Sequence, residues 1–239
     1  MNIVISKDGI LSQYDGYFDL KELDWDAYRA KFGNIYRLDR ILKAEGKSAD
    51  EFKVAKQADT LMIFYNLDPE QVTHMLQNLG YSLPNDYLSR NLSYYLARTS
   101  HGSTLSRVVH AQLANMIGDK KLSWDLYHDA LTSDYNDIQG GTTAEGIHSG
   151  VMAGTVLIAL GTYAGLNLRS DIVKISPSLP QHWRKIGFRF TFQGESYHVE
   201  SGKNEVSVKV ISDQRSEVPV EIAGKTHQLI ADVEHKFSF

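Results

Sequence analysis

The chain has no cysteine among its 239 residues. Disulfide bonds and thiolate metal sites are therefore excluded, and the absence fits a reducing compartment. Basic residues do not predominate either, because 25 Lys and Arg residues stand against 29 Asp and Glu residues, which gives a formal net charge of -4. A chain without a basic field is not expected to bind nucleic acid.

Long apolar runs are also missing. The most apolar run, 151–160, is too short to span a bilayer, and residues 1–9 lack the basic start and long apolar core of a signal peptide. We therefore expect a soluble, cytoplasmic protein. With 42% hydrophobic residues, the chain can bury a sizeable core in one large domain or in two unequal ones.

The first two thirds of the sequence favour helices. Residues 3–20 contain short apolar runs broken by Asp-Gly pairs, which indicates a looped connection. Apolar residues then recur every three or four positions, as in amphipathic helices. The expected helical segments are 23–42, 52–67, 68–79, 85–97, 105–117, 122–131 and 151–164. The last is apolar nearly all round, so we expect it to be buried on every side. Such a series indicates a double-layered helical barrel or a stack of helix pairs.

The pattern changes near residue 170. Residues 187–193 alternate strictly between apolar and polar side chains, and Gly194-Glu195 predicts a hairpin turn. Segments 206–210, 218–222 and 228–233 continue in the same manner. We therefore predict a mostly α protein with a C-terminal antiparallel β module, a small sandwich, and place the boundary so that residues 1–168 form the helical domain and 169–239 the β domain.

Two loops rich in hydroxyl groups and glycine, 99–104 and 140–150, lead into expected helices, and each carries a histidine in its sequence. A helix N-terminus has unpaired backbone N–H groups and a partial positive charge, so such loops favour anions. The hydroxyl groups, the glycines and the one histidine of each loop are therefore candidate anion-binding groups. Lys56, expected with Gln57 at the head of a third helix, adds a fixed cation. Together these residues favour an oxyanion, and phosphate in particular.

Each of these residues also has a simpler interpretation. Ser, Thr and Gly before a helix are most often helix caps. His110 and His128 fall within expected helices, and the spacing of His101 and His110 fits no metal site, so we predict no metal. Glu145 could act as a catalytic base, but a glutamate in the first turn of a helix is also the usual favourable partner of the helix dipole.

Four motifs carry a family resemblance. They are Lys56-Gln57-Ala58-Asp59 and the segments 94–106, 141–148 and 177–183. In this order they resemble the C-terminal half of glycoside hydrolase family 65, the family of maltose, trehalose and kojibiose phosphorylases. The resemblance implies a partial (α/α)6 barrel followed by a small C-terminal β-sandwich. It also implies that an α-glucosidic bond is cleaved with inversion by inorganic phosphate as co-substrate, with no other cofactor.

The resemblance also implies roles for residues. Lys56 and Gln57 would contact the sugar in the −1 subsite, while Ser100, His101, Ser103 and Thr104, with His148 opposite, would hold phosphate. The general acid of the family is a glutamate far upstream of the Lys-Gln pair, so we expect it to lie outside this chain and no catalytic acid to lie within it. The implied partners are a disaccharide, phosphate, and either a second copy or the missing N-terminal half.

Three functional classes remain open. In an α-glucoside phosphorylase, an imidazolium at His101 and backbone donors at Gly102 would favour phosphate over water. An inverting hydrolase of the same family would need a carboxylate base, for which Glu145 is the nearby candidate. A non-catalytic carbohydrate-binding or assembly module would fit the expected absence of the acid. The sequence does not identify the disaccharide.

Overall fold

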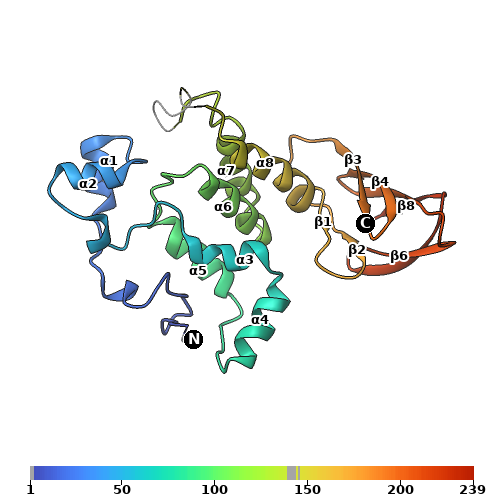
Figure 1. The fold of residues 1–239 in the computed structure, drawn as a ribbon, viewed down its shortest axis with the longest axis horizontal. Coiled ribbons are helices and arrows are strands. Elements are labelled where there is room, and N and C mark those ends of the chain that lie inside the picture. The colour runs from blue at the N-terminus through green and yellow to red at the C-terminus, as the bar shows by residue number, and fades with distance from the viewer. Residues whose placement is uncertain (1–2, 139–143, 145) are drawn as a thin grey trace. The chain divides into compact units, whose positions relative to one another are not determined.

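The computed structural model describes residues 3–138, 144 and 146–239 (Figure 1). The chain divides into two compact units, Met1–Thr155 and Val156–Phe239. None of the helices in the described ranges combines the length and apolarity needed to cross a membrane.

The first unit is helical, as the sequence predicted. Its α-helices are α1 (Trp25–Phe32), α2 (Leu38–Ala44), α3 (Met62–Asn66), α4 (Pro69–Asn78), α5 (Tyr87–Leu96), α6 (Leu105–Met116), α7 (Lys120–Leu131) and α8 (Ser149–Leu157), the last of which runs into the second unit. Short 3-10 helices that the structure describes in full include η1 (Tyr17–Asp19), η2 (Ala49–Glu51) and η3 (Asp59–Leu61). The expected helices over 68–79, 85–97, 105–117 and 122–131 correspond to α4–α7 and are confirmed.

Acidic residues set the starts of three of these helices. Asp24 and Asp119 each accept a hydrogen bond from the backbone N–H three residues on, at the starts of α1 and α7. At the start of α4, Asp68 takes part in a capping box and Pro69 occupies the first turn, where a missing N–H costs nothing. The local sequence therefore fixes where these helices begin.

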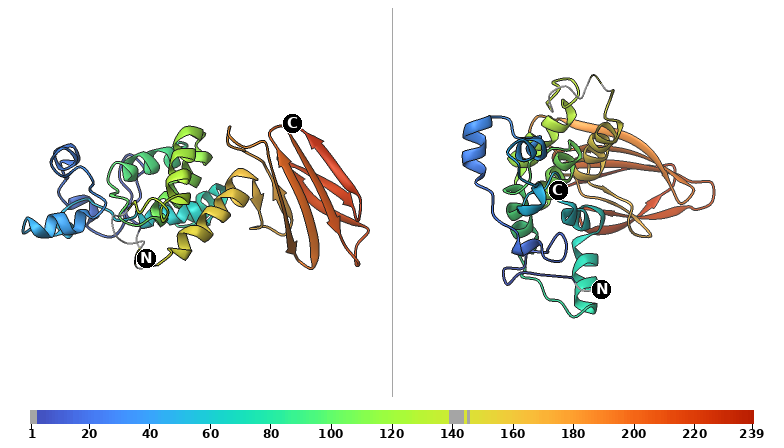
Figure 2. Two further views of the ribbon diagram at one scale, coloured as in Figure 1. Left: turned by 90° about the horizontal axis from the view of Figure 1, so that it is seen from above. Right: turned by 60° about the vertical axis from the view of Figure 1, so that its left-hand side comes forward.

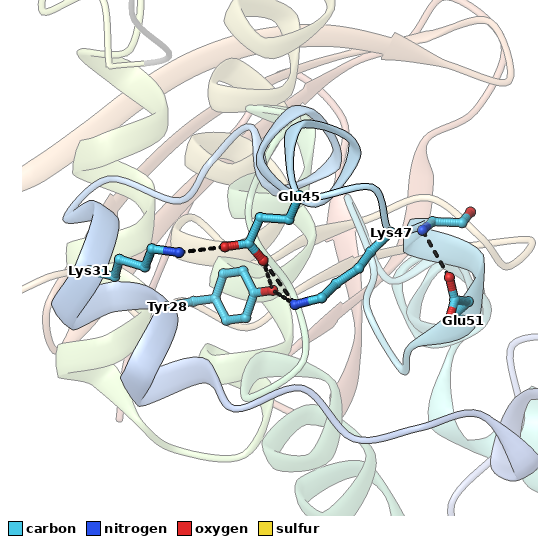
Figure 3. Close-up of polar contacts among 6 residues, drawn as sticks. Tyr28, Lys31, Glu45, Lys47 and Glu51 are labelled. Atoms are coloured by element: carbon cyan, nitrogen blue, oxygen red, sulfur yellow. Dashed lines mark hydrogen bonds and ion pairs between the residues drawn. The ribbon is translucent and has the colours of Figure 1, made fainter.

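The α1–α2 segment has a small apolar core of its own, formed by Leu23, Leu38 and Leu42. Figure 3 shows the polar network beside it, in which Glu45 accepts hydrogen bonds from Lys31 (2.6 Å), the Tyr28 hydroxyl (2.5 Å) and Lys47 (2.9 Å). These bonds, with the one from Lys31 the largest effect, lower the pKa of Glu45 to about 2. The end of α2 is thus tied to α1 by a carboxylate that stays charged.

The expected helix over 52–67 is only half right. Helical structure begins at Asp59 with η3 and continues through α3, whereas residues 52–58 form an irregular segment. The prediction fails there because Ala55 pairs with Thr99 in an isolated parallel bridge, a long-range contact that local spacing does not reveal. Lys56 and Gln57 therefore precede the helix and do not stand at its head.

The expectation that 151–164 is buried on every side is wrong. Val151 is buried and Gly154 packs against α6, but Val156 and Leu157 are 58% and 59% exposed. The helix does continue, because α8 is followed by a π-helical segment, η5 (Ile158–Tyr163). An all-round apolar sequence thus has one face in the core and another exposed in this structure.

The second unit contains two four-stranded sheets (Figure 2). The first has the order β1 (Leu166–Asn167), β2 (Val173–Ile175), β6 (Glu217–Ile222), β7 (Lys225–Ile230), and the second has the order β3 (Lys185–Phe192), β4 (Glu195–Gly202), β5 (Glu205–Ile211), β8 (Glu234–Ser238). Alternate residues of both sheets fill one apolar core. The strands are not all antiparallel as expected, because β2 and β6 are parallel.

Two boundaries in this unit differ from the sequence-based expectation. The strand expected over 228–233 is β7, which ends at Ile230, because the chain turns at Asp232 with a φ of 64°. The change of unit falls at 155–156, upstream of the change of residue pattern near 168. The physical reason is that η5 is attached to the β module, since the Ser178 N–H donates to the Tyr163 carbonyl at 2.8 Å and the Tyr163 ring meets Trp183.

Gly165 links η5 to β1 at a position that tolerates no side chain. Its φ is +73°, and a Cβ would lie 2.0 Å from the Ser176 carbonyl oxygen. We expect Gly165→Ala to destabilise the second unit by roughly 3 kcal/mol or more, against about 1 kcal/mol for an alanine that only has to adopt a positive φ. The matched control is Gly224→Ala, because Gly224 has a φ of +79° but nothing within 4 Å of its Cβ position. Urea unfolding measures both losses, and equal losses would contradict this account.

Candidate functional site

The Lys56 segment and the first hydroxyl-rich loop lie side by side. The Ala55 N–H donates to the Arg98 carbonyl at 2.8 Å, and the Ser100 N–H donates to the Ala55 carbonyl at 2.9 Å. These two bonds lie on either side of Thr99 and form one backbone junction. Lys56 comes directly after this junction in one segment, and His101 comes directly after it in the other. Sequence reasoning placed both in the site, and the structure brings their segments together.

Gly102 is the point of closest approach. A Cβ on this residue would lie 2.5 Å from the Tyr36 carbonyl oxygen, 3.0 Å from Lys56 Cγ and 3.3 Å from Ser100 Oγ. Any side chain here would therefore displace backbone. The absence of a side chain lets the Lys56 stem lie directly against the loop, and Lys56 and Ser103 line the same pocket.

A pocket of about 440 Å³ opens beside this junction. It is lined by Lys56, Gln57, Ser103, Asp59, Gln13, Tyr14, Tyr17, Ala49, Asp50, Val54 and Ala55. The Gln57 amide donates to Asp59 at 3.0 Å, which fixes its orientation. The pocket combines aromatic rings, one lysine, the carboxylates of Asp50 and Asp59 and a few neutral polar groups, and such a mixture suits a small polar ligand.

The hydroxyl groups of the first loop differ in their surroundings. Ser100 is buried, and its hydroxyl donates to the Ala55 carbonyl at 3.4 Å. It therefore adds a side-chain hydrogen bond to the backbone junction. Ser103 lines the pocket. Thr104 is buried at the start of α6 and, among the described residues, makes no side-chain capping hydrogen bond there. The simpler interpretation of Thr104 as a side-chain cap is therefore not supported.

His101 adopts a left-handed backbone conformation, with a φ of 53°. Its Nδ1 lies 3.0 Å from the Ser106 hydroxyl, and its ring meets that of His110 at 5.1 Å between centroids. Burial, with His110 and Arg107 as further causes, lowers the pKa of His101 to about 3. The interpretation of His101 as an imidazolium is therefore wrong, and the ring is a neutral hydrogen-bonding group.

Arg107 is a residue that sequence reasoning missed. It is 2% exposed, it donates to the His101 carbonyl at 3.4 Å, and its guanidinium lies 4.8 Å from the centre of the Tyr36 ring. Its charge is partnered by Asp129, at 3.7 Å. The available signal was an arginine next to Val108 and Val109 in the sequence of α6, since a buried arginine needs partners that hold it.

The second loop is described from Gly146 onward, together with Ala144, and the candidate base Glu145 lies outside the described residues, as do 139–143. His148 directly precedes α8, and Asp134 accepts two hydrogen bonds from it, one from the backbone N–H at 2.8 Å and one from ring Nδ1 at 2.5 Å. Asp134 was missed because it lies fourteen residues away in the sequence. The carboxylate fixes Nδ1 as the protonated nitrogen and turns Nε2 outward.

The starts of α6 and α8 lie next to each other. A Cβ on Gly150 would lie 3.9 Å from Leu105 Cδ2, and one on Gly154 would lie 3.0 Å from Val108 Cγ2. The two glycines let the helices approach closely near their first turns. Both N-termini, with Thr104 before one and His148 before the other, are therefore at the same end of the helix pair, as a shared anion site requires.

A metal centre is not indicated by the arrangement of side chains. Across residues 3–138, 144 and 146–239, no three His, Asp or Glu side chains are grouped so that they could hold a metal ion. The structure brings Lys56 and Ser103 to one pocket and sets the starts of α6 and α8 next to each other. Cations, hydroxyl groups and helix N-termini are groups that can bind an oxyanion.

The model of the glycosyl hydrolase family 65 central catalytic domain matches residues 1–157, and that of the family's C-terminal domain matches residues 166–229. A trehalose 6-phosphate phosphorylase from Lactococcus lactis is 50% identical over 82% of this chain and 25% of its own length. A kojibiose phosphorylase from Halothermothrix orenii is 27% identical over 92% of this chain and 26% of its own length.

Among solved structures, one described as a kojibiose phosphorylase from the human microbiome superposes with a TM-score of 0.75 at 26% identity. The alignment covers 100% of this chain and 32% of that one. The chain spans about a quarter of the length of the two curated relatives.

The buried His110 and the partly buried His101 predict an acid-sensitive fold. The pKa of His101 is lowered to about 3 and that of His110 to about 4, in both cases mainly by burial. The unfolded chain then binds more protons than the folded chain between about pH 4 and 6.5, so stability is fully present above pH 6.5 and is lost as the pH falls. Urea unfolding midpoints measured from pH 7.5 to 4.5 check this. His110→Asn should weaken the dependence of the unfolding midpoint on pH, whereas the control His74→Asn, at an exposed histidine, should leave it unchanged. If His110→Asn showed the wild-type pH dependence, the role of His110 would be contradicted.

Proposed function

Because the chain belongs to glycosyl hydrolase family 65, we propose that it is part of an enzyme that cleaves a glucose-containing disaccharide with inorganic phosphate and releases glucose 1-phosphate. A phosphate oxygen attacks the anomeric carbon, the glycosidic C–O bond breaks with inversion, and a general acid protonates the leaving oxygen. The observation that carries the proposal is the contact of Lys56 with Gly102, because it puts a cation beside the hydroxyl-rich loop.

In this proposal the residues divide the work between sugar and phosphate. Lys56 supplies the charge, Ser103 supplies a hydroxyl donor at the start of α6, and His148 contributes from the start of α8. Gln57 contacts the sugar in the pocket that it lines. Phosphate is already an anion, so the attack needs no catalytic base, and a site made of donors and a cation is sufficient on the nucleophile side.

The rest of the enzyme is also part of the proposal. The relatives are about three to four times as long as this chain, by the coverage of the two curated matches. We propose that α1–α8 correspond to half of an (α/α)6 barrel and that the general-acid glutamate is on the other half. The 239 residues alone are therefore expected to bind ligands without turning over a disaccharide. The 50% identity to the Lactococcus lactis relative makes trehalose 6-phosphate the first substrate to test.

Binding of phosphate by the chain itself is the simplest test. We expect inorganic phosphate to raise the unfolding temperature of the 239-residue chain by a few degrees at concentrations well above the dissociation constant. Lys56→Ala should remove most of this increase, because the cation is lost. The control Lys121→Ala removes an exposed lysine of α7 that is paired with Asp125, and it should retain the increase. An equal increase in all three proteins would exclude Lys56 from the site.

Activity can be tested after the chain is joined to the N-terminal part of the Lactococcus lactis relative. Ser103→Ala should lower the phosphorolysis of trehalose 6-phosphate by roughly 10²-fold, as the loss of one preorganised donor does, while slow hydrolysis should change much less. Chromatography of the products measures both reactions. Glu145→Gln should keep phosphorolysis. If free glucose is released in place of glucose 1-phosphate, and Glu145→Gln abolishes that release, the enzyme is the family's inverting hydrolase and the phosphorylase proposal fails.

A further inference from the structure

The hydrogen-bonding atoms around His101 specify which of its nitrogens carries the proton. His110 is 0% exposed, and its Nδ1 lies 2.7 Å from the Ser106 carbonyl oxygen. A carbonyl oxygen can only accept, so the hydrogen is on Nδ1 of His110. The other nitrogen, Nε2, is buried and has no hydrogen-bond partner among the described residues, which is consistent with its being an unprotonated nitrogen.

The Ser106 hydroxyl connects this ring to His101. Its described contacts are two, His101 Nδ1 at 3.0 Å and His110 Nδ1 at 3.4 Å. Because His110 Nδ1 already carries a hydrogen, it cannot accept one from the serine. The hydroxyl hydrogen therefore goes to His101 Nδ1, and the hydrogen of the neutral His101 ring must be on Nε2.

The surrounding charges favour a neutral ring as well. The groups that act on His101 are His110 and Arg107 on α6 and Arg29 on α1. Two of these groups are cations, so a further positive charge on His101 would be unfavourable. Lys56 can supply charge to an anion in this site, whereas His101 can supply only a directed donor.

We propose that Ser106 is a positioning residue that holds His101 in the Nε2–H form and thereby aims a neutral N–H donor at the phosphate. This inference rests on the proposed function, because it assigns the means by which the same site orients its anion. His110 completes the arrangement by occupying the Ser106 carbonyl and by fixing, with its own Nδ1–H, the direction in which the serine donates. The pair Ser106 and His110 thus determines the geometry of a group that contacts the ligand without either residue contacting the ligand itself.

The arrangement has a consequence for binding. A donor that is neutral at all pH values above about 5 does not gain or lose a proton in the range in which phosphate changes its own charge. The pH dependence of phosphate binding to the wild-type chain should therefore follow the second ionisation of phosphate. A contribution from His101 should appear only when its partner is removed.

The test uses nitrogen NMR of the full chain labelled at its histidines. At pH 7 we expect His110 as the Nδ1–H form and His101 as the Nε2–H form. In Ser106→Ala, the His101 nitrogens should shift toward a mixture of forms and the ring should take up a proton at a higher pH. The dissociation constant for inorganic phosphate should rise about 10-fold, as the loss of one well-aligned donor implies. Ser106→Thr keeps the hydroxyl and should restore both signals and affinity. Ser93→Ala, an exposed serine of α5, is the matched control.

Each outcome decides between the alternatives. His101 found as the Nδ1–H form in the wild-type chain overturns the inference, and so does a Ser106→Ala variant that keeps both the wild-type nitrogen shifts and the wild-type affinity. If Ser106→Ala does not fold, the wild-type nitrogen shifts decide alone. If the expected His101 form is found but the wild-type chain binds no phosphate, the proposed function fails while the positioning role of Ser106 for the His101 ring stands.

Discussion

Two backbone hydrogen bonds hold the candidate site together. They join Ala55 to the Arg98 carbonyl and to the Ser100 N–H, at 2.8 and 2.9 Å, between segments that are more than forty residues apart. Because both bonds are made by the main chain, they set the register of the Lys56 segment against the loop independently of side chains. If the Lys56 segment were shifted by one residue along the loop, a neighbouring residue would face Gly102 in place of Lys56, and its side chain would point to the opposite side. The position of the cation, and with it the affinity for an anion, therefore depends on this junction.

The other elements of the first unit support the junction from two sides. The Glu45 network fastens α1 to the end of α2 (Figure 3), and the loop between these helices brings the Tyr36 carbonyl against Gly102 and its ring over Arg107. On the other side, Gly154 lets α8 approach α6 closely, which sets two helix N-termini at one end. The site is thus a loop held between packed helices, and this arrangement limits the motion that would weaken its donors.

Prediction from the sequence succeeded where structure depends on neighbouring residues and failed where it depends on distant ones. The helices α4–α7 follow from a local period of three to four residues, and the motif placed Lys56 and Ser103 together in one site, where both line the same pocket. The irregular segment 52–58 was predicted to be helical, because the local sequence does not reveal that Ala55 pairs with the distant Thr99. Asp134, fourteen residues from His148, left no local signal. The charge of His101 was misjudged for the same reason, since its pKa is set by burial that only the folded chain provides.

The central claim is that one oxyanion site is formed by the first loop and the starts of α6 and α8. Backbone amide NMR of the 239-residue chain during titration with inorganic phosphate tests this most directly. The account predicts that the largest shift changes are at residues 101–105 and 148–150 and at Lys56, and that they saturate with a single dissociation constant. Changes confined to the basic surface of the β module around Lys185 and Lys203, or saturating separately in the two loops, would contradict it.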